Sequence, residues 1–221
     1  GQLMQIDVYD NPAGNYNVAI AGTSGSGKSL LLNEIAAAYL GTGARVWIID
    51  VGRSYEKACR HFGGSFIEFT EDAGFSLNPF AMVQDIDEDM ELLQPLLAQM
   101  VSPREPLNGF QYSTLGAAIK QVWKSNGPAM TVTDVHDLLS RGRLDDDNTL
   151  EDDRRLRDLA AMLHPFTREG AYGRYFDTGT PIDFSADLIV LELEELKTRK
   201  DLQTVVLLIV MYRITREMYF S

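Results

Sequence analysis

The first third of the chain alternates apolar runs with stretches rich in helix formers. The apolar runs are typical of strands and fall at residues 5–9, 17–21, 45–51 and 65–69. Residues 30–40 and 54–62 lie between them and predict helices, each ended by glycines. Because strands that alternate with helices form parallel sheets with crossover helices, this pattern predicts an α/β fold.

The middle third loses the strand pattern and predicts helices alone. Four helices are expected, at residues 85–100, 111–125, 133–140 and 150–163. The first has an acidic first turn that suits the helix dipole, and Thr133 is the expected N-cap of the third. No run between residues 80 and 172 is typical of a strand, so residues 81–171 are predicted to form an all-helical insertion.

The last third returns to the pattern of the first. Residues 187–193 (DLIVLEL) predict a buried strand. Residues 202–219 predict a helix that is apolar around its whole circumference in the middle, which is typical of a buried helix. Residues 1–80 and 172–221 are therefore expected to form one core with a mostly parallel sheet.

A glycine-rich segment between residues 17–21 and the first helix has the pattern G-x-x-x-x-G-K-S. It consists of Gly22, Thr23, Ser24, Gly25, Ser26, Gly27, Lys28 and Ser29, followed by Leu30. Glycines let backbone N–H groups approach phosphate oxygens closely, and the helix that begins near Lys28 points its positive end at the anion. An ordinary glycine turn before a helix requires neither a lysine nor a hydroxyl at these positions.

This phosphate loop predicts that the chain binds a nucleoside triphosphate, ATP together with Mg²⁺. Lys28 is expected to reach the β- and γ-phosphates and to be the catalytic cation, and the Ser29 hydroxyl is expected to ligate magnesium.

Hydrolysis also needs an acid at a strand end and a group that orients water. Two strand ends offer such acids, Asp50 after residues 46–49 and Glu192 in the strand at residues 187–193. Neither has the adjacent Asp-Glu pair usual for a strong ATPase. Asp50 is therefore either a catalytic acid or a residue that caps a helix or turn. Glu192 is either catalytic or solvent-facing, because it alternates with Leu191 and Leu193.

Composition adds limits to this interpretation. The formal net charge of −12 opposes tight binding to nucleic acid unless a local basic patch exists, and the basic clusters of the sequence are mixed with acids. A single cysteine, Cys59, excludes a disulfide within the chain and fits a reducing cytoplasm. No apolar run reaches the roughly 18 residues of a membrane-spanning helix. The three histidines lack metal-ligand spacing and are interpreted as structural.

Several strings in order resemble the ATPase domain of TraC-type conjugation proteins, the large ATPases of type IV secretion systems. They are NYNVAIA before the glycine loop, IDVGRSY at residues 49–55, NPF at 78–80, YGRYFD at 172–177 and LELEEL at 191–196. The resemblance implies a RecA-like P-loop NTPase core with an all-helical insertion. It also implies ATP hydrolysis, a homo-hexamer, partners in the secretion channel, a coupling ATPase, and a cytoplasmic place against the bacterial inner membrane.

The resemblance also raises an expectation about the ends of the chain. In the family, an apolar strand ending in Asp-Glu, the Walker B strand, follows the helix that here begins near Leu202, and the sequence stops before any such strand. The chain is therefore expected to be a piece of a motor that energises pilus assembly and substrate transfer. By itself it is expected to bind ATP, to hydrolyse it weakly and to be mostly monomeric.

Two other functions remain open from the sequence. The chain is alternatively a nucleotide-gated assembly module with little turnover, or a motor that translocates DNA. The acidic charge counts against DNA as a direct ligand, although a hexamer pore can still carry a local basic ring.

Overall fold

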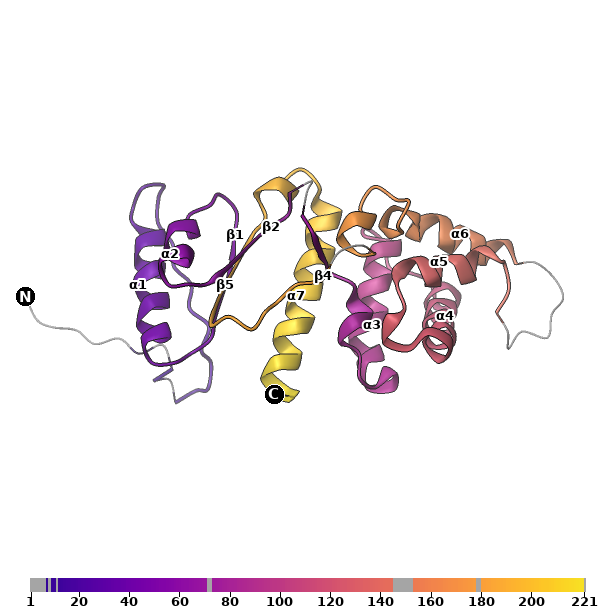
Figure 1. Ribbon diagram of the computed structural model, residues 1–221, viewed down its shortest axis with the longest axis horizontal. Coiled ribbons are helices and arrows are strands. Elements are labelled where there is room, and N and C mark those ends of the chain that lie inside the picture. Colours follow the sequence, from indigo (N-terminus) through magenta and orange to yellow (C-terminus); the bar gives the residue numbers. More distant parts are fainter. Residues whose placement is uncertain are drawn as a thin grey trace, which may run out of the picture.

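The computed structural model describes residues 7, 9–10, 12–70, 73–144, 153–177 and 180–220, with the backbone alone at 181 and 217–220. The molecule is elongated (Figure 1). A parallel sheet with two helices lies at one end, a group of four helices lies at the other, and the long helix α7 (Lys200–Phe220) stands between them.

The sheet has three parallel strands in the order β1-β5-β2. They are β1 (Val46–Asp50), β5 (Leu188–Glu192) and β2 (Ser65–Glu68), each at a position that the apolar runs predicted. Every residue of β5 is buried, because this strand is paired on both edges and covered on both faces. The last strand of the sequence is thus the middle strand of the sheet.

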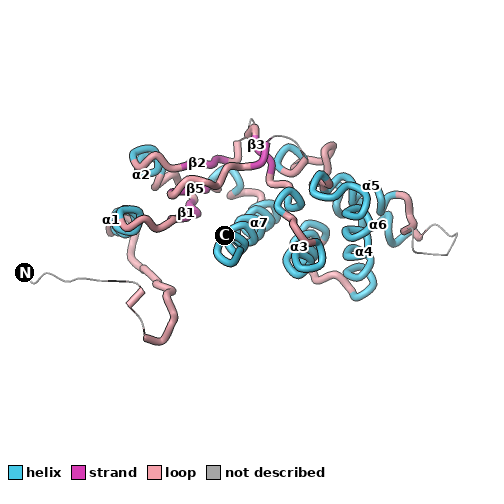
Figure 2. Tube along the Cα trace, turned by 60° about the horizontal axis from the view of Figure 1, so that its bottom comes forward, coloured by secondary structure: helices cyan, strands magenta, loops and turns pink. Residues whose placement is uncertain are grey.

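Helices cover both faces of this sheet. The face formed by Leu188 and Val190 packs with Tyr55 and Cys59 beside α2 (Glu56–His61), and Leu40 of α1 (Lys28–Gly41) packs against the same cluster. The opposite face contributes to the main core, which includes α7, and Figures 1 and 2 both place α7 between the sheet and the helical group. The three layers are those of an α/β fold with a parallel sheet.

The predicted strand at residues 17–21 is wrong. These residues have no strand assignment, and all but Ile20 are exposed. A strand is stabilised by hydrogen bonds to a neighbouring strand, and no described strand pairs with this segment. An apolar run therefore forms a strand only where the fold also places a neighbouring strand beside it. The predicted strand at 5–9 lies largely outside the described residues.

The middle of the chain forms the expected helices, which are α3 (Ile86–Val101), α4 (Gly109–Asn126), α5 (Val132–Ser140) and α6 (Arg154–Leu163). The first residues of the fourth prediction, 150–152, lie outside the described part. The assignment of Thr133 as N-cap is wrong, because Thr131 caps α5 in a capping box with Asp134. The Thr133 hydroxyl instead contacts Asp177 and the backbone N–H of Arg168.

Two short strands that the sequence did not predict connect the helical group to the sheet. β3 (Phe75–Ser76) pairs in parallel with β4 (Thr180–Pro181). Strands of two residues are too short to show a period of two in the sequence. Their pairing brings the two ends of the helical segment together, so the segment leaves the sheet and returns to it at one place.

Helix α7 is buried on one side only. Its buried side chains include Leu202, Val206 and Val210, whereas Leu208 is 39% exposed and Met211 is 53% exposed. The expectation of burial around the whole circumference is therefore wrong for these two residues. Among the described helices, none is long and apolar enough to cross a membrane.

A buried ion pair joins α7 to α3. The Arg216 guanidinium donates to both carboxylate oxygens of Asp89, at 2.9 and 2.6 Å, and the Tyr212 hydroxyl donates to the same carboxylate at 3.0 Å. Only 12% of the Arg216 side chain and 10% of the Asp89 side chain are exposed. Burial raises the pKa of Tyr212 to about 12, so its hydroxyl stays protonated and donates at neutral pH.

We expect Arg216→Met to lower the free energy of unfolding by about 3 kcal/mol, because the Asp89 charge would then be buried without its partner. Urea denaturation measures the loss. Lys120→Met is the matched control, because Lys120 pairs with Asp87 at the surface, and exposed pairs contribute less than about 1 kcal/mol. Equal effects of the two substitutions would contradict the prediction.

Candidate nucleotide-binding site

The glycine loop has the backbone that its sequence requires. Gly25 (φ 77°) and Gly27 (φ 89°) adopt left-handed conformations that other residues rarely reach. A Cβ atom on Gly22 would lie 2.5 Å from the Ser26 hydroxyl oxygen, so a larger residue there would require the Ser26 side chain to rotate. Apart from Lys28, the loop from Gly22 to Ser29 is exposed. The loop thus presents its backbone to solvent at the point where α1 begins.

Helix α1 begins at Lys28, as predicted, with Gly27 as its N-cap. No side chain caps this end of the helix. Its first N–H groups have no partner within the helix, and with the helix dipole they favour an anion at this position. The Lys28 ammonium donates to the carbonyl oxygens of Gly22 and Thr23, at 2.7 and 2.8 Å. The side chain therefore folds back onto the first two residues of the loop.

Ser29, the expected magnesium ligand, lies beside Tyr55. Tyr55 is 6% exposed and belongs to the cluster between α2 and the sheet. Burial, followed by the charge of Asp50, raises the pKa of the Tyr55 hydroxyl, and the Ser29 side chain partly offsets the rise. Tyr55 directly follows the turn between Asp50 and Ser54 and is the N-cap residue of α2.

Three carboxylates lie in register at the carboxyl edge of the sheet. Asp50 is paired with Glu192 across β1 and β5, and Glu68 is paired with Glu192 across β2 and β5. The carboxyl edge is where α/β sheets bind their ligands. Among the described residues, however, no group of three His, Cys, Asp or Glu side chains converges on a possible metal position.

Asp50 has a turn-forming role. One of its carboxylate oxygens accepts a hydrogen bond of 2.7 Å from the backbone N–H of Ser54, and its carbonyl accepts one of 2.9 Å from Leu193. The turn it closes leads into α2. The sequence allowed Asp50 to be either a catalytic acid or a residue that caps a helix or turn. The hydrogen bond to Ser54 is the one expected of a turn residue.

Glu192 is buried, with 2% of its surface exposed, so the solvent-facing alternative is wrong. Its carboxylate accepts hydrogen bonds from the backbone N–H groups of Gly52 (3.1 Å), Arg53 (2.6 Å) and Glu194 (2.9 Å). The alternation with Leu191 and Leu193 failed as a guide, because β5 is buried on both faces.

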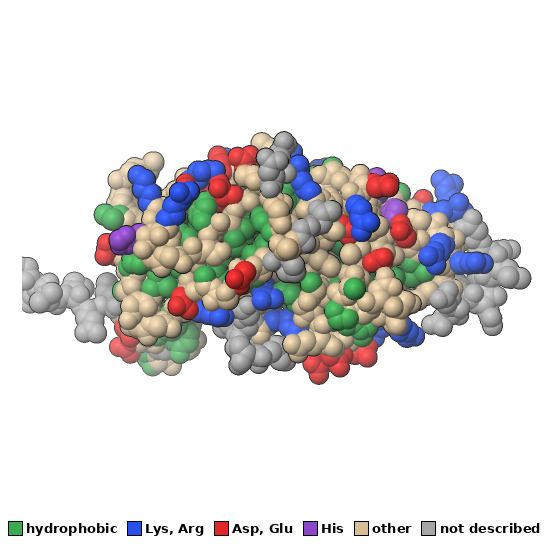
Figure 3. Space-filling model, in the orientation of Figure 1, with side chains coloured by type: hydrophobic (Ala, Val, Ile, Leu, Met, Phe, Trp, Pro, Cys, Tyr) green, Lys and Arg blue, Asp and Glu red, His purple; other side chains and the backbone are tan. Residues whose placement is uncertain are grey.

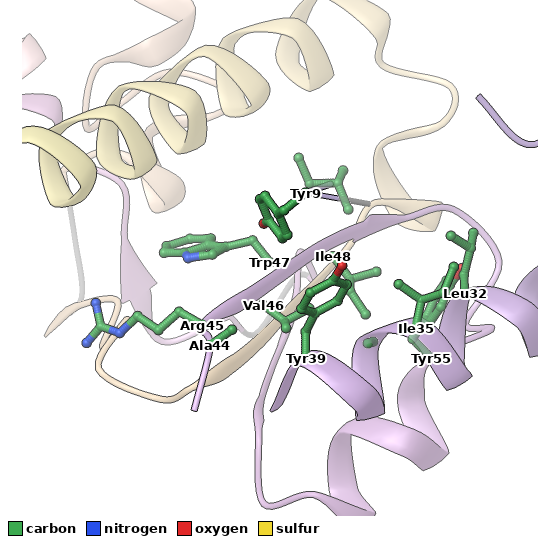
Figure 4. A pocket seen from close by; sticks show the side chains of 12 residues that line it. Tyr9, Leu32, Ile35, Tyr39, Ala44, Arg45, Val46, Trp47, Ile48 and Tyr55 are labelled. Carbon is green, nitrogen blue, oxygen red and sulfur yellow. The ribbon is translucent and has the colours of Figure 1, made fainter. Parts of the chain in front are cut away.

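A cavity of about 470 Å³ lies between α1 and β1 (Figure 4). Its lining includes Leu32, Ile35, Trp47 and Tyr55, and most of the lining side chains are aromatic or aliphatic. It runs along the open edge of β1, beside the glycine loop rather than in it. In Figure 4, Tyr55 lies near Leu32 of α1, at one end of the cavity.

The charged side chains do not form a single basic face. On the face drawn in Figure 3, blue and red side chains are interspersed over both ends of the molecule. Several of the described basic side chains are paired with acids, among them Arg60 with Glu56 and Arg155 with Asp153. On this face, the mixing agrees with the sequence-based interpretation of the basic clusters.

Sequence reasoning missed Tyr55, Arg53 and Glu68 as neighbours of the site. Glu68 is the last residue of β2 and lies one residue before the end of the strand predicted at 65–69, so the rule that selected Asp50 and Glu192 also selects it. Arg53 has a positive φ of 57°, and its side chain pairs with Glu68. No signal in the sequence places Tyr55 in the buried cluster beside α2, because that position depends on how α1 and α2 share one face of the sheet.

The fold and the glycine loop together define a phosphate-loop α/β domain, and comparison with known proteins identifies its family. The profile of the TraG P-loop domain matches residues 1–220. The chain therefore belongs to the TraG P-loop domain family, and the resemblance to TraC-type conjugation proteins is confirmed.

Two relatives support this assignment. The chain is 30% identical to protein TraC of Escherichia coli (strain K12) over 224 residues, which cover 99% of the chain and 25% of TraC. The structure of VirB4 of Thermoanaerobacter pseudethanolicus matches with a TM-score of 0.75 at 20% identity, covering 98% of this chain and 62% of VirB4. The VirB4 match confirms the predicted fold class, a RecA-like P-loop core with a parallel sheet. The chain spans about a quarter of the length of TraC.

Proposed function

We propose that this chain is the ATP-binding part of a motor that energises pilus assembly and substrate transfer in a type IV secretion system. The observation that carries the proposal is the exposed loop from Gly22 to Ser29, in which Gly25 and Gly27 adopt left-handed conformations directly before an uncapped helix. Membership of the TraG P-loop domain family supports the same function.

In this proposal, ATP binds with its phosphates against the glycine loop. The backbone N–H groups of residues 22–29 and the first turn of α1, including Leu30, surround the phosphate oxygens. Lys28 exchanges its two carbonyl partners for the β- and γ-phosphates, because a charge-assisted bond to phosphate is stronger than a bond to a neutral carbonyl.

The residues at the loop also fit a magnesium ion. Ser29 provides a hydroxyl at the start of α1, next to the carboxyl edge of the sheet where Asp50 ends β1. Magnesium bound with ATP neutralises charge on the phosphates. Ser29 would hold that ion, and the Asp50 oxygen that does not accept from Ser54 would be the carboxylate available to it or to its water ligands.

The proposed partners are those of the parent motor. The family supports a homo-hexamer whose partners are secretion channel proteins and a coupling ATPase. It also supports peripheral contact with the cytoplasmic side of the bacterial inner membrane. Within the chain, the proposed division is a core of residues 1–80 with 172–221 and an insertion of residues 81–171. DNA as a direct ligand is weakly supported, since the net charge is −12.

A second function, a nucleotide-gated assembly module, is favoured by one observation. Glu192 is buried and accepts hydrogen bonds from three backbone N–H groups, so this carboxylate is not available to a water molecule without rearrangement. Nucleotide binding would then set the arrangement of subunits with little turnover.

We expect Lys28→Ala to weaken ATP binding by about 1.5–3 kcal/mol, which is the contribution of a hydrogen bond to a charged group. Isothermal calorimetry with Mg²⁺ and ATP measures the difference. Lys124→Ala on α4 is the matched control and should leave the affinity unchanged. Equal affinity of the wild type and Lys28→Ala would contradict the proposal.

We expect the 221-residue chain to bind ATP and hydrolyse it barely above background. Arginines from neighbouring subunits typically supply about 10³–10⁵ in rate, and Asp50 and Glu192 are engaged in the turn. Phosphate release at saturating ATP tests this expectation, with and without DNA. Fast hydrolysis that Asp50→Asn or Glu192→Gln abolishes would show instead that the catalytic carboxylate lies in this chain.

We expect the chain alone to be mostly monomeric, with the hexamer formed by the longer parent. The physical reason is that the chain spans 25% of the length of TraC, so contacts between subunits that other parts of such a protein make are not available to it. Light scattering with and without ATP measures the mass in solution. A stable hexamer of this chain would contradict the expectation.

A further inference from the structure

Helices α3 and α7 lie side by side and run in opposite directions (Figures 1 and 2). The Asp89–Arg216 pair joins the beginning of α3 to the last part of α7. At the other end, the Arg104 guanidinium, just beyond α3, lies 3.9 Å from the Asp201 carboxylate in the first turn of α7. Because contacts are made at both ends, the two helices meet along most of their length, and a groove runs between them.

This α3–α7 groove contains an apolar cavity of about 160 Å³. Leu92 and Pro95 of α3 line it from one side, and Leu208 and Met211 of α7 line it from the other. The leucines and the methionine remain open to solvent, and Leu92 is 43% exposed. Apolar side chains are ordinary on a protein surface when they are scattered, but a group that shares one hollow is typical of an interaction surface.

The spacing of the lining residues suits a third helix. Leu208, Met211 and Thr215 are spaced i, i+3 and i+7 on α7, and Leu92 and Pro95 are spaced i and i+3 on α3, so each set lies on one face of its helix. A hollow between two such faces accepts an amphipathic helix. An extended segment fits less well, because a helical surface has no backbone edge with which its N–H and C=O groups could pair.

Acidic side chains border the groove where α3 begins. Helix α3 contains four acids and no basic residue, and two of these acids are used in the pairs with Lys120 and Arg216. The other two, Glu88 and Glu91, are exposed and make no ion pair within the described part of the chain. Figure 3 shows acidic side chains gathered at the lower edge of the molecule, below α3. This end of the groove therefore favours a cation.

Pro95 adds an acceptor at the same place. A proline inside a helix has no N–H for the carbonyl four residues before it, which here is the carbonyl of Glu91. Glu91 and Pro95 both line the cavity. The carboxylate and the carbonyl of Glu91 thus both favour a positively charged donor, and a lysine or arginine beside the apolar face of a partner helix would supply one.

A second copy of this chain fits the groove less well than a different protein. Helix α6 carries three arginines, but its leucines are buried. Helix α1 exposes Leu30, but its one basic residue, Lys28, belongs to the glycine loop. Helix α4 exposes Phe110 at the opposite end from Lys124. None of these three helices therefore combines an exposed apolar face with bases beside it.

We propose that the α3–α7 groove docks an amphipathic helix of another protein, one whose apolar face is flanked by lysine or arginine. The apolar face of that helix covers Leu92, Leu208 and Met211, and its bases pair with Glu88 and Glu91. The inference goes beyond the proposed function, because it involves no nucleotide and no residue of the glycine loop.

Synthetic helical peptides test the groove. A fluorescent peptide of about 18 residues, or about five turns, carries leucine at every third or fourth position and lysine on both flanks. A second peptide has glutamate in place of lysine, and a third has the composition of the first in scrambled order. Fluorescence anisotropy with the 221-residue chain should show the lysine peptide binding at least about tenfold more tightly than either of the others. Equal binding of the three peptides would overturn the proposal.

The first variant replaces both Leu92 and Met211 by alanine. Because these side chains line opposite walls of the cavity, the double variant should weaken binding of the lysine peptide about five- to tenfold. Met162→Ala is the matched control, since Met162 is 38% exposed and lies on α6. Unchanged affinity in the double variant would overturn the groove as the docking site. If urea denaturation shows that the double variant is less stable, the second variant decides the question.

The second variant replaces both Glu88 and Glu91 by glutamine, which leaves the core untouched because both side chains are exposed. Affinity for the lysine peptide should fall about five- to tenfold at low salt and differ little from wild type at high salt. Glu169→Gln, also exposed, should change nothing. No loss, or a loss that is independent of salt, would overturn the proposal. Self-association of the wild type that Met211→Ala abolishes would also overturn it, because a second copy would then occupy the groove.

Discussion

The burial of β5 is the constraint on which the rest of the structure depends. Both other strands of the sheet pair with it, and its side chains supply both faces of the core. A strand in this position can end in a charged residue only if that charge finds partners, because an unpaired buried carboxylate is very costly. The turn after β1 and the residues after β5 provide those partners for Glu192.

This arrangement connects the stability of the sheet to the geometry of the glycine loop. The turn that satisfies Glu192 also contains the Asp50–Ser54 contact and leads to Tyr55. Helix α1 has no buried residue, so it is held in place by few contacts, and Tyr55 is one of the buried residues beside it. A shift of the glycine loop and α1 is therefore expected to alter the positions of residues at the carboxyl ends of β1 and β5 first.

The helical group is attached to the same sheet by polar contacts as well as by packing. Strands β3 and β4 bring its two ends together, and the Asp89–Arg216 pair fixes α3 to α7. Helix α7 follows β5 after the short turn at Glu194–Leu196. The carboxyl edge of the sheet and the helical group are thus connected through one continuous segment.

The sequence by itself determined the elements with strong local signals. Glycines, a lysine and a hydroxyl at fixed spacing predicted the phosphate loop, and apolar periodicity predicted β1, β2, β5 and the helices of the middle segment. Tertiary structure decided the rest, because strand order and burial depend on partners distant in sequence. It left residues 17–21 without a neighbour among the described strands, buried Glu192 on a strand whose alternation suggested a solvent-facing side chain, and buried Tyr55 against β5.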